Sequence, residues 1–337
     1  MNWLVRPLWN SKEGRLRAGW RVLLYIALWL VGPALAHLWV GRPLAEWLWW
    51  LFPQLTIFPE RVLFSLLTLA TMLVGTWLMV RYVDHRPLRD LGLGLDRHWW
   101  CDLCFGLILG AGLMLFVFTV EWLAGWVTVR ALFWSAPGSG PFLLAIFGPL
   151  VVFVVVGISE ELLTRGYQMR NLAEGLYLPP LSPRLALLAA WLLSSLFFGL
   201  LHIRNPNSSW ISTSYLVLAG LLFGLGTMLT GRLGLPIGLH ITWNFFQGNV
   251  FGFPVSGNNY ASVTFIAIEQ QGPILWTGGA FGPEAGLIGI VALLLGGVAT
   301  VIWVRHRYRV LRLCDHWAIY RPWRTRPVAL DPLRPTP

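Results

Sequence analysis

Uninterrupted apolar stretches of about 20 residues, separated by short polar segments, run along most of the chain. Eight of them can be drawn, at about 20–40, 62–82, 103–128, 141–164, 185–203, 212–231, 235–251 and 285–304. A helix rises 1.5 Å per residue, so about 20 apolar residues cross the hydrocarbon core of a bilayer. Barrel strands would show short alternating stretches, and these do not alternate. The pattern predicts an all-α fold, a polytopic membrane helix bundle of about eight transmembrane helices.

The composition supports the same class of protein. Hydrophobic residues make up 56% of the chain and charged residues only 12%, with a mean hydropathy of +0.63. Soluble domains carry about a quarter charged residues, so this chain has too few to cover a soluble globule. Tryptophan-rich stretches at 46–52 and 97–100 are typical of the membrane–water interface. We therefore expect an integral membrane protein, and the Arg-rich sequence with its single lysine, Lys12, favours a bacterial plasma membrane.

The net charge of +10 is distributed as a topology signal. If the N-terminus is cytoplasmic, 21 of the 25 Lys and Arg residues fall in inside segments and 4 in outside segments. Cytoplasmic loops carry such an excess, so both termini are predicted to be cytoplasmic. The basic segment 305–313 directly follows the last apolar stretch, where attraction to anionic lipid headgroups accounts for its charge. Membrane lipids are therefore expected partners, and nucleic acid is not.

The chain divides by pattern into three parts. Residues 1–60 hold a basic N-terminus, the first transmembrane helix and an outer interfacial segment; residues 61–304 form a membrane-embedded core; residues 305–337 form a basic cytoplasmic tail. Within the core, a Gly-rich segment without Lys or Arg, 252–284, precedes the last apolar stretch. Long loops of this kind include lids and partner surfaces, but we favour an ordinary mobile loop.

Ionisable side chains inside the apolar stretches are few, and each is costly in lipid, so each is a functional hypothesis. They are His37, Glu121, Glu160, Glu161, His202 and His240, joined by the neutral polar Asn244. His37 stands near the outer end of its helix and is interpreted as interfacial, and Glu121 has no assigned role. The remaining residues fall on three separate helices.

The spacing of these residues places them in pairs. Glu161 and Arg165 are four residues apart and share a helix face, so they are predicted to form an ion pair. Glu160 then lies about 100° around the helix, where it can face a cavity. Two further pairs have the same spacing: Phe198 with His202, and His240 with Asn244. One carboxylate and two imidazoles can therefore converge from three helices.

Three motifs connect these pairs with a known family. The stretches EELLTR (160–165), FGLLH (198–202) and HITWN (240–244) resemble, in order, the EExxxR, FxxxH and HxxxN/D motifs of the CAAX protease and bacteriocin-processing family of intramembrane proteases. That family includes the type II CAAX prenyl endopeptidases and bacterial Abi-type proteins. The stretch DHRPLRDLGLG (84–94) is similar to one common in these bacterial proteins. The resemblance covers roughly residues 80–250 and implies an eight-helix intramembrane endopeptidase.

The resemblance also implies roles for the motif residues. Glu160 and His202 would activate a water molecule, and His240 with Asn244 would stabilise the oxyanion of the tetrahedral intermediate. A carboxylate in a low-dielectric cavity is a better general base near neutral pH, which suits Glu160. The other motif residues would support the site: Glu161, Arg165 and Phe198.

A metal ion is the competing mechanism, since the family has been described both as metalloproteases and as glutamic proteases. Two imidazoles and a carboxylate match a catalytic zinc site with an open position. In that version His202, His240 and Glu160 or Glu161 bind the ion, and the remaining glutamate acts as base. We favour the metal-free version, with no cofactor, because Asn244 follows His240 by one turn and is a ready oxyanion donor but a poor zinc ligand.

The expected substrate is a membrane-associated peptide or protein tail, CAAX-like or leader-type, and nothing in the chain requires it to be prenylated. Two other classes of function stay open: an ion- or proton-coupled transporter, and a non-catalytic chaperone or immunity factor with the same fold. Counting along the helices puts Glu160 and His240 at the cytoplasmic side and His202 at the outer end. A shared site then requires tilted helices, a displaced helix boundary or a cavity near the midplane.

Overall fold

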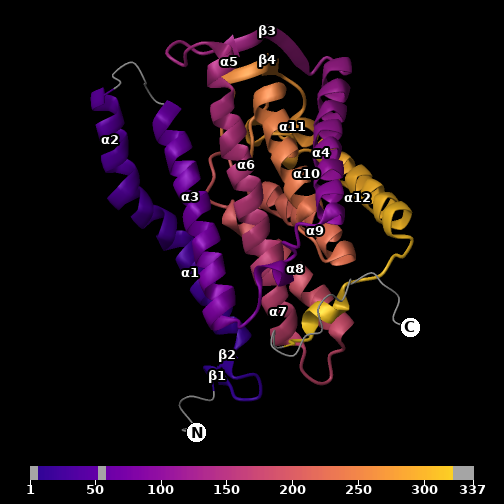
Figure 1. The fold of residues 1–337 in the computed structure, drawn as a ribbon. Helices are drawn as coiled ribbons and strands as arrows, with labels where there is room; N and C mark the ends of the chain where they lie inside the picture. The colour runs from indigo at the N-terminus through magenta and orange to yellow at the C-terminus, as the bar shows by residue number, and fades with distance from the viewer. Residues whose placement is uncertain (1–6, 52–57, 322–337) are drawn as a thin grey trace.

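Long helices run side by side through most of the molecule (Figure 1). The computed structural model describes residues 7–51 and 58–321; the remaining parts of the predicted N-terminal segment and basic tail lie outside the described residues. Within the described ranges, seven helical segments are long and apolar enough to cross a membrane: Ala18–Leu51, Val62–Val83, Arg97–Leu123, Phe142–Leu176, Pro183–Leu201, Trp210–Thr230 and Leu287–Tyr308. The protein is an integral membrane protein built as an all-α bundle, which confirms the predicted fold class.

The main helices and strands follow one another with short connections. The helices are α1 (Ala18–Ala36), α2 (Arg42–Leu51), α3 (Phe58–Leu78), α4 (Arg97–Leu123), α5 (Phe142–Ala145), α6 (Phe147–Glu161), α7 (Met169–Leu176), α8 (Pro183–Leu201), α9 (Trp210–Thr230), α10 (Gly234–Phe245), α11 (Ile274–Thr277) and α12 (Leu287–Tyr308). The strands are β1 (Trp9–Asn10), β2 (Arg15–Leu16), β3 (Val127–Ser135) and β4 (Val263–Gln270). Wider π-helical turns join α1 to α2 and α6 to α7, and extend α3 and α10.

The eighth predicted span, 235–251, is the short helix α10 with its π-helical continuation, of 12 and 5 residues. It packs against α4, α6 and α9. Arg15, which precedes α1, has its guanidinium 3.3 Å from the ring centroid of Tyr320, which follows α12. Both ends of the described chain therefore meet at one face of the bundle. Ends on one face correspond to an even number of crossings, which α10 would complete, although it is too short to be among the seven segments that qualify as spans in the described ranges.

The helix that carries Glu160 is longer than the sequence predicts. The predicted span 141–164 stops just before Arg165, the first of the charged residues that follow it, but α5, α6, the π-helical turn and α7 form one helical segment of 35 residues. Arg165, the first of these charges, is buried and paired with Glu161. Because the ion pair neutralises the charge inside the bundle, the helix continues past it. Glu160 consequently lies near the middle of the segment and not at its end.

A second buried carboxylate, Glu174 in α7, binds several arginines at the end of the bundle. Its Oε2 accepts from Arg15 Nη2 at 2.8 Å and from Arg86 Nη2 at 2.6 Å, while Arg21 Nη1 lies 2.8 Å from Asp84 Oδ1. Burial alone lowers the pKa of Arg86, but Glu174 and Asp84 outweigh it and raise this pKa above its ordinary value. Arg86 therefore stays charged, and the network joins β2, α1, α7 and the segment after α3.

The helices α4 and α10 approach each other through glycines. A Cβ added at Gly106 would lie 2.2 Å from Leu235 O, and one added at Gly110 would lie 2.3 Å from Thr242 Oγ1. On the facing helix, a Cβ at Gly238 would lie 2.3 Å from Leu103 O. Small residues four apart are a common means of bringing two membrane helices into backbone contact. These glycines fix the position of α10, which carries His240 and Asn244.

The segment predicted as a mobile loop, 252–284, contains the strand β4. It pairs antiparallel with β3, from Val127 opposite Gln270 to Ser135 opposite Val263. The residues of β3, VTVRALFWS, are mostly β-branched and aromatic, which favours a strand. The predicted span 103–128 accordingly ends earlier, at Leu123.

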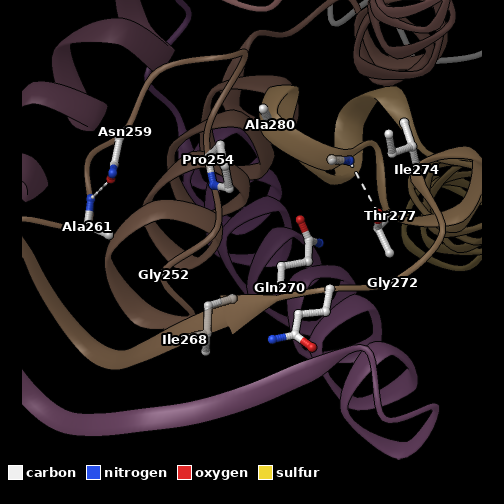
Figure 2. Close-up of a pocket in the computed structure, with 12 residues that line it drawn as sticks. Gly252, Pro254, Asn259, Ala261, Ile268, Gln270, Gly272, Ile274, Thr277 and Ala280 are labelled. Atoms are coloured by element: carbon white, nitrogen blue, oxygen red, sulfur yellow. Dashed lines mark hydrogen bonds between the residues drawn. The ribbon is translucent and has the colours of Figure 1, made fainter.

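The two-stranded sheet lies at the opposite end of the bundle from β1 and β2 (Figure 1). A cavity of about 460 Å³ separates β4 from the segment 252–261, with Gln270 on one wall and Pro254 on the other (Figure 2). The sheet therefore covers this end of the bundle, in close contact with the segment beneath it at Gly252 and separated from it by the cavity beyond.

The close contact between α4 and α10 predicts a difference between two glycines of the same helix. Gly110→Ala places a methyl group against α10 and is expected to destabilise the fold by about 1–3 kcal/mol, the usual range for overpacking. Gly112→Ala is the matched control, because a Cβ at Gly112 meets nothing within 4 Å. Thermal unfolding in detergent should show a lower Tm for Gly110→Ala only. Equal Tm values for the two variants would contradict the role of Gly110.

Candidate active site

One cavity of about 380 Å³ brings together the residues of the three sequence motifs. It is lined by Glu160 from α6, Phe198 and His202 from α8 and its end, and His240 and Asn244 from α10. The expected convergence of three helices is therefore present. The longer helix around Glu160 explains it. Glu160 lies about as far from Leu176, where its helical segment ends, as His202 lies from Pro183, where α8 begins. A displaced helix boundary resolves the difference in depth.

The two imidazoles face the same oxygen of Glu160. His202 Nε2 and His240 Nε2 each lie 4.0 Å from Glu160 Oε2. The Glu160 side chain is 19% exposed, and the oxygen itself is buried without a hydrogen-bond partner among the described residues. A buried carboxylate oxygen without a donor is costly, so this position calls for a water molecule, a cation or a substrate group.

The other nitrogen of each imidazole defines its tautomer. His202 Nδ1 lies 2.8 Å from the Phe198 carbonyl oxygen, and His240 Nδ1 lies 2.8 Å from Glu161 Oε1. Carbonyl and carboxylate oxygens only accept, so each Nδ1 carries the hydrogen and donates it. In the neutral rings Nε2 then presents a lone pair to the space beside Glu160. Three acceptors, two nitrogens and one oxygen, thus face a common point.

The predicted ion pair between Glu161 and Arg165 is present and fully buried. Glu161 Oε1 accepts from Arg165 Nη1 at 3.0 Å, and the two side chains are 0% and 1% exposed. Arg165 Nη2 also donates to the Gly220 carbonyl of α9 at 2.9 Å, and its guanidinium lies 4.4 Å from the Phe198 ring centroid. Glu161 is occupied by Arg165 and His240, so it supports the site from behind while Glu160 faces the cavity.

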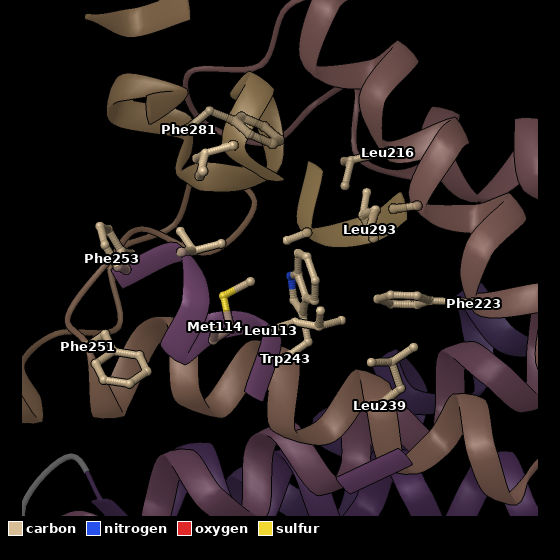
Figure 3. Close-up of a cluster of buried hydrophobic side chains, with 14 of the residues drawn as sticks. Leu113, Met114, Leu216, Phe223, Leu239, Trp243, Phe251, Phe253, Phe281 and Leu293 are labelled. Carbon is tan, nitrogen blue, oxygen red and sulfur yellow. The ribbon is translucent and has the colours of Figure 1, made fainter. Parts of the chain in front are cut away.

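The floor of the cavity belongs to the large buried hydrophobic cluster drawn in Figure 3, where the rings of Trp243 and Phe223 lie close to Leu293. The Phe223 ring centroid is 5.2 Å from that of His240. Phe223 lies outside the three motifs, and Trp243 occupies an unspecified position of the third, so only their places on α9 and α10 bring them to the site. Their apolar surface keeps the imidazole of His240 in a low-dielectric setting.

The cavity also contains a carboxylate that sequence reasoning missed. Glu284, in the short 3₁₀ turn before α12, lines the same cavity as Glu160 and is 6% exposed. Burial raises the pKa of Glu284, against the opposing effects of hydrogen bonds from Ser256 and of the nearby His202. Its only signal in the sequence is an acidic residue in a Gly-rich segment with few charges. Glu121, in contrast, lies away from this cavity and accepts from Gln270.

The donor atoms can be compared with those of a zinc site. Ligands around a tetrahedral zinc ion lie roughly 3.3 Å apart, somewhat closer than the 4.0 Å between Glu160 Oε2 and each imidazole. Within the described residues no group of three or more His, Cys, Asp and Glu side chains is arranged to hold a metal ion. The chemistry of the set still fits, because both Nδ1 atoms are held as metal-binding histidines usually are. His202, His240 and Glu160 are the residues that would bind.

The buried ion pair predicts a large loss of stability on substitution. Arg165→Met leaves the Glu161 charge buried with only the His240 hydrogen bond, which should cost on the order of 3–5 kcal/mol. The matched control is Arg130→Met, because Arg130 pairs with Glu269 at the surface, where the side chains are 57% and 47% exposed. Thermal unfolding in detergent should show a much lower Tm for Arg165→Met and no change for Arg130→Met. A wild-type Tm for Arg165→Met would refute the structural role of the pair.

Comparison with known proteins gives two matches. Residues 142–246 match the family profile described as "Type II CAAX prenyl endopeptidase Rce1-like", a range that includes all three motifs. The chain is also 26% identical over 176 residues to "Uncharacterized protein YyaK" of Bacillus subtilis (strain 168). That alignment covers 51% of this chain and 55% of the relative, so the chain spans about half the length of that protein. No solved structure matches the chain.

Proposed function

Because residues 142–246 form a domain of the Rce1-like type II CAAX prenyl endopeptidase family, we propose that this membrane protein is an intramembrane endopeptidase in which Glu160 is the general base. The family match supports CAAX-type intramembrane protease activity in general. The observation that carries the residue assignment is the single oxygen, Glu160 Oε2, that faces both imidazole Nε2 atoms in a cavity of the bundle.

The acceptors around this point suit a water molecule. Glu160 Oε2 and His202 Nε2 can each accept one of its two hydrogens. Glu160 takes a proton from the water molecule while the water oxygen attacks the carbonyl carbon of the scissile peptide. The proton then passes to the nitrogen of the leaving amine and the C–N bond breaks, which forms a carboxylic acid and an amine; the acid loses its proton to the amine or to solvent on release. His202 holds the water in line between the base and the substrate.

The tetrahedral intermediate carries a negative oxygen that needs donors. Asn244 lines the cavity one helical turn after His240, and its amide supplies one N–H. His240 donates from Nε2 only when its ring is protonated, and the Glu161 carboxylate at Nδ1 then faces a positive imidazolium. We therefore assign oxyanion stabilisation to His240 and Asn244, with Glu161 holding His240 in orientation.

Zinc remains the second mechanistic proposal. If bound by His202, His240 and Glu160, the ion would lower the pKa of its water and polarise the peptide carbonyl. That version needs a further glutamate as base, and Glu161 does not line the cavity; its Oε1 is bound by Arg165 and His240. The placement of Glu161 is a second reason, besides Asn244, for favouring the metal-free version.

The cavity lining supports a membrane-associated substrate. One part is apolar, with Trp29, Leu30 and Phe153, and the other holds the polar motif residues. We propose a peptide or protein tail, CAAX-like or leader-type, as the substrate, with no requirement for a prenyl group. We also propose a bacterial plasma membrane location with both termini cytoplasmic, where the arginines at the end of α12 attract anionic headgroups.

The test is cleavage of fluorogenic CAAX-type and leader-type peptides, with and without a prenyl group, by purified protein in detergent. Glu160→Gln should lower kcat by roughly 10²- to 10⁴-fold, the usual contribution of a general base. His202→Ala should also be strongly impaired. Glu121→Gln is the matched control, because Glu121 is a buried membrane-helix carboxylate outside the cavity, and it should retain wild-type activity.

A chelator separates the two mechanisms in the same assay. Activity kept in chelator supports a glutamate-activated water, and activity lost in chelator and restored by zinc supports the metal site. Full cleavage by Glu160→Gln would refute the assignment of the base. If the cellular function survives Glu160→Gln, the protein acts as a non-catalytic chaperone or immunity factor instead.

A further inference from the structure

A tight turn beyond the three motifs forms one wall of the catalytic cavity. Val255 and Asn258 exchange two backbone hydrogen bonds of 2.9 Å, which closes a two-residue hairpin turn. Its central residues, Ser256 and Gly257, have φ of +46° and +82°. Both central residues of a type I′ turn need positive φ, and a serine in this region is strained. Such a conformation persists only if its surroundings hold it.

Glu284 is the charged residue that holds this turn. Its Oε2 accepts from the backbone N–H of Ser256 at 2.5 Å and from the Ser256 hydroxyl at 2.9 Å. Neutral groups complete the attachment: Asn205 Nδ2 donates to the Ser256 carbonyl at 2.9 Å, and the Gly257 N–H donates to the Phe281 carbonyl at 2.8 Å. Hydrogen bonds to a charged acceptor are roughly twice as strong as neutral ones. Glu284 therefore makes the strongest of these attachments.

The segment around the turn separates two cavities. Val255, Ser256, Asn258 and Tyr260 line the catalytic cavity. Pro254, Asn259 and Ala261 line the cavity beneath β4 (Figure 2). The segment is fixed by packing at Phe253 and Val255, which are buried, and by the hydrogen bonds of the turn where it faces the catalytic cavity.

We propose that Glu284 is a positioning residue of the active site, which fixes the Val255–Asn258 turn as the wall that seats the substrate peptide opposite Glu160. This inference rests on the proposed endopeptidase function. Glu284 lies beyond the range of the family match, residues 142–246. The turn presents Ser256 and Asn258 to the cavity, so the wall offers polar groups to the peptide backbone. Loosening it should weaken substrate binding while the groups that activate water stay in place.

The first measurement is backbone hydrogen exchange of residues 252–262, followed by mass spectrometry of the full chain in detergent. Glu284→Gln keeps one neutral acceptor oxygen, and Glu284→Ala keeps none. Exchange in this segment should therefore rise moderately in the first variant and more in the second. Glu269→Gln is the matched control, because Glu269 lies in β4 and pairs with the exposed Arg130. It should leave the exchange of this segment unchanged.

The second measurement is peptide cleavage by the same variants. We expect KM to rise roughly 10- to 100-fold in Glu284→Ala, the equivalent of losing hydrogen bonds to a charged group, with less effect in Glu284→Gln. The value of kcat should change by only a few-fold. A loss confined to kcat, or unchanged kinetics despite faster exchange, would overturn the positioning role.

The two proposals fail in different ways. Unchanged exchange in both Glu284 variants refutes the attachment of the turn, whatever the activity. A wild-type protein that cleaves no peptide, prenylated or not, counts against the proposed function. In that case the attachment is judged by exchange alone, which supports it if exchange rises in the Glu284 variants and refutes it if exchange is unchanged in both.

Discussion

A single buried ion pair links the helices that build the site. Glu161 and Arg165 neutralise each other inside the bundle, where an isolated charge would cost several kcal/mol. The pair reaches the neighbouring helices, because Glu161 accepts from His240 of α10 while Arg165 donates to Gly220 of α9 and lies over Phe198 of α8. None of these contacts can shift without exposing a buried charge. The position of His240 therefore follows directly from a pair that does not itself face the cavity, and that of His202 follows through the helix that carries Phe198.

Two adjacent glutamates thus acquire different roles through their surroundings. Glu161 has an arginine and an imidazole as partners, and it is fully buried. Glu160 points to the cavity, where Oε2 has imidazole nitrogens at 4.0 Å and no donor among the described residues. The first carboxylate is held by its partners and serves structure. The second has its unpartnered oxygen in the cavity, beside the two imidazoles, which is the property that a base for a bound water requires.

The sequence predicts the parts of this arrangement that depend on local spacing. Residues four apart share a helix face, so the pair of Glu161 with Arg165 is read directly from the chain. The continuation of the same helix to Leu176 is not predictable in this way, since Glu174 is neutralised by Arg15 and Arg86, which are 159 and 88 residues away. The pairing of β3 with β4 and the approach of Glu284 to the cavity depend on similarly distant contacts.

Catalysis and substrate seating are therefore assigned to different parts of the chain. The groups assigned to the chemistry come from helices packed through glycines and a buried ion pair, an arrangement that tolerates little movement. The turn from Val255 to Asn258 lies outside these helices, faces the catalytic cavity and is held there largely by hydrogen bonds to Glu284, Asn205 and Phe281, so its shape depends on residues that the helices do not share. Changes in the residues of this turn can then alter which peptides bind, while the geometry of the helices stays the same. A chain with the same three motifs and a different wall would be expected to cut different substrates by the same chemistry.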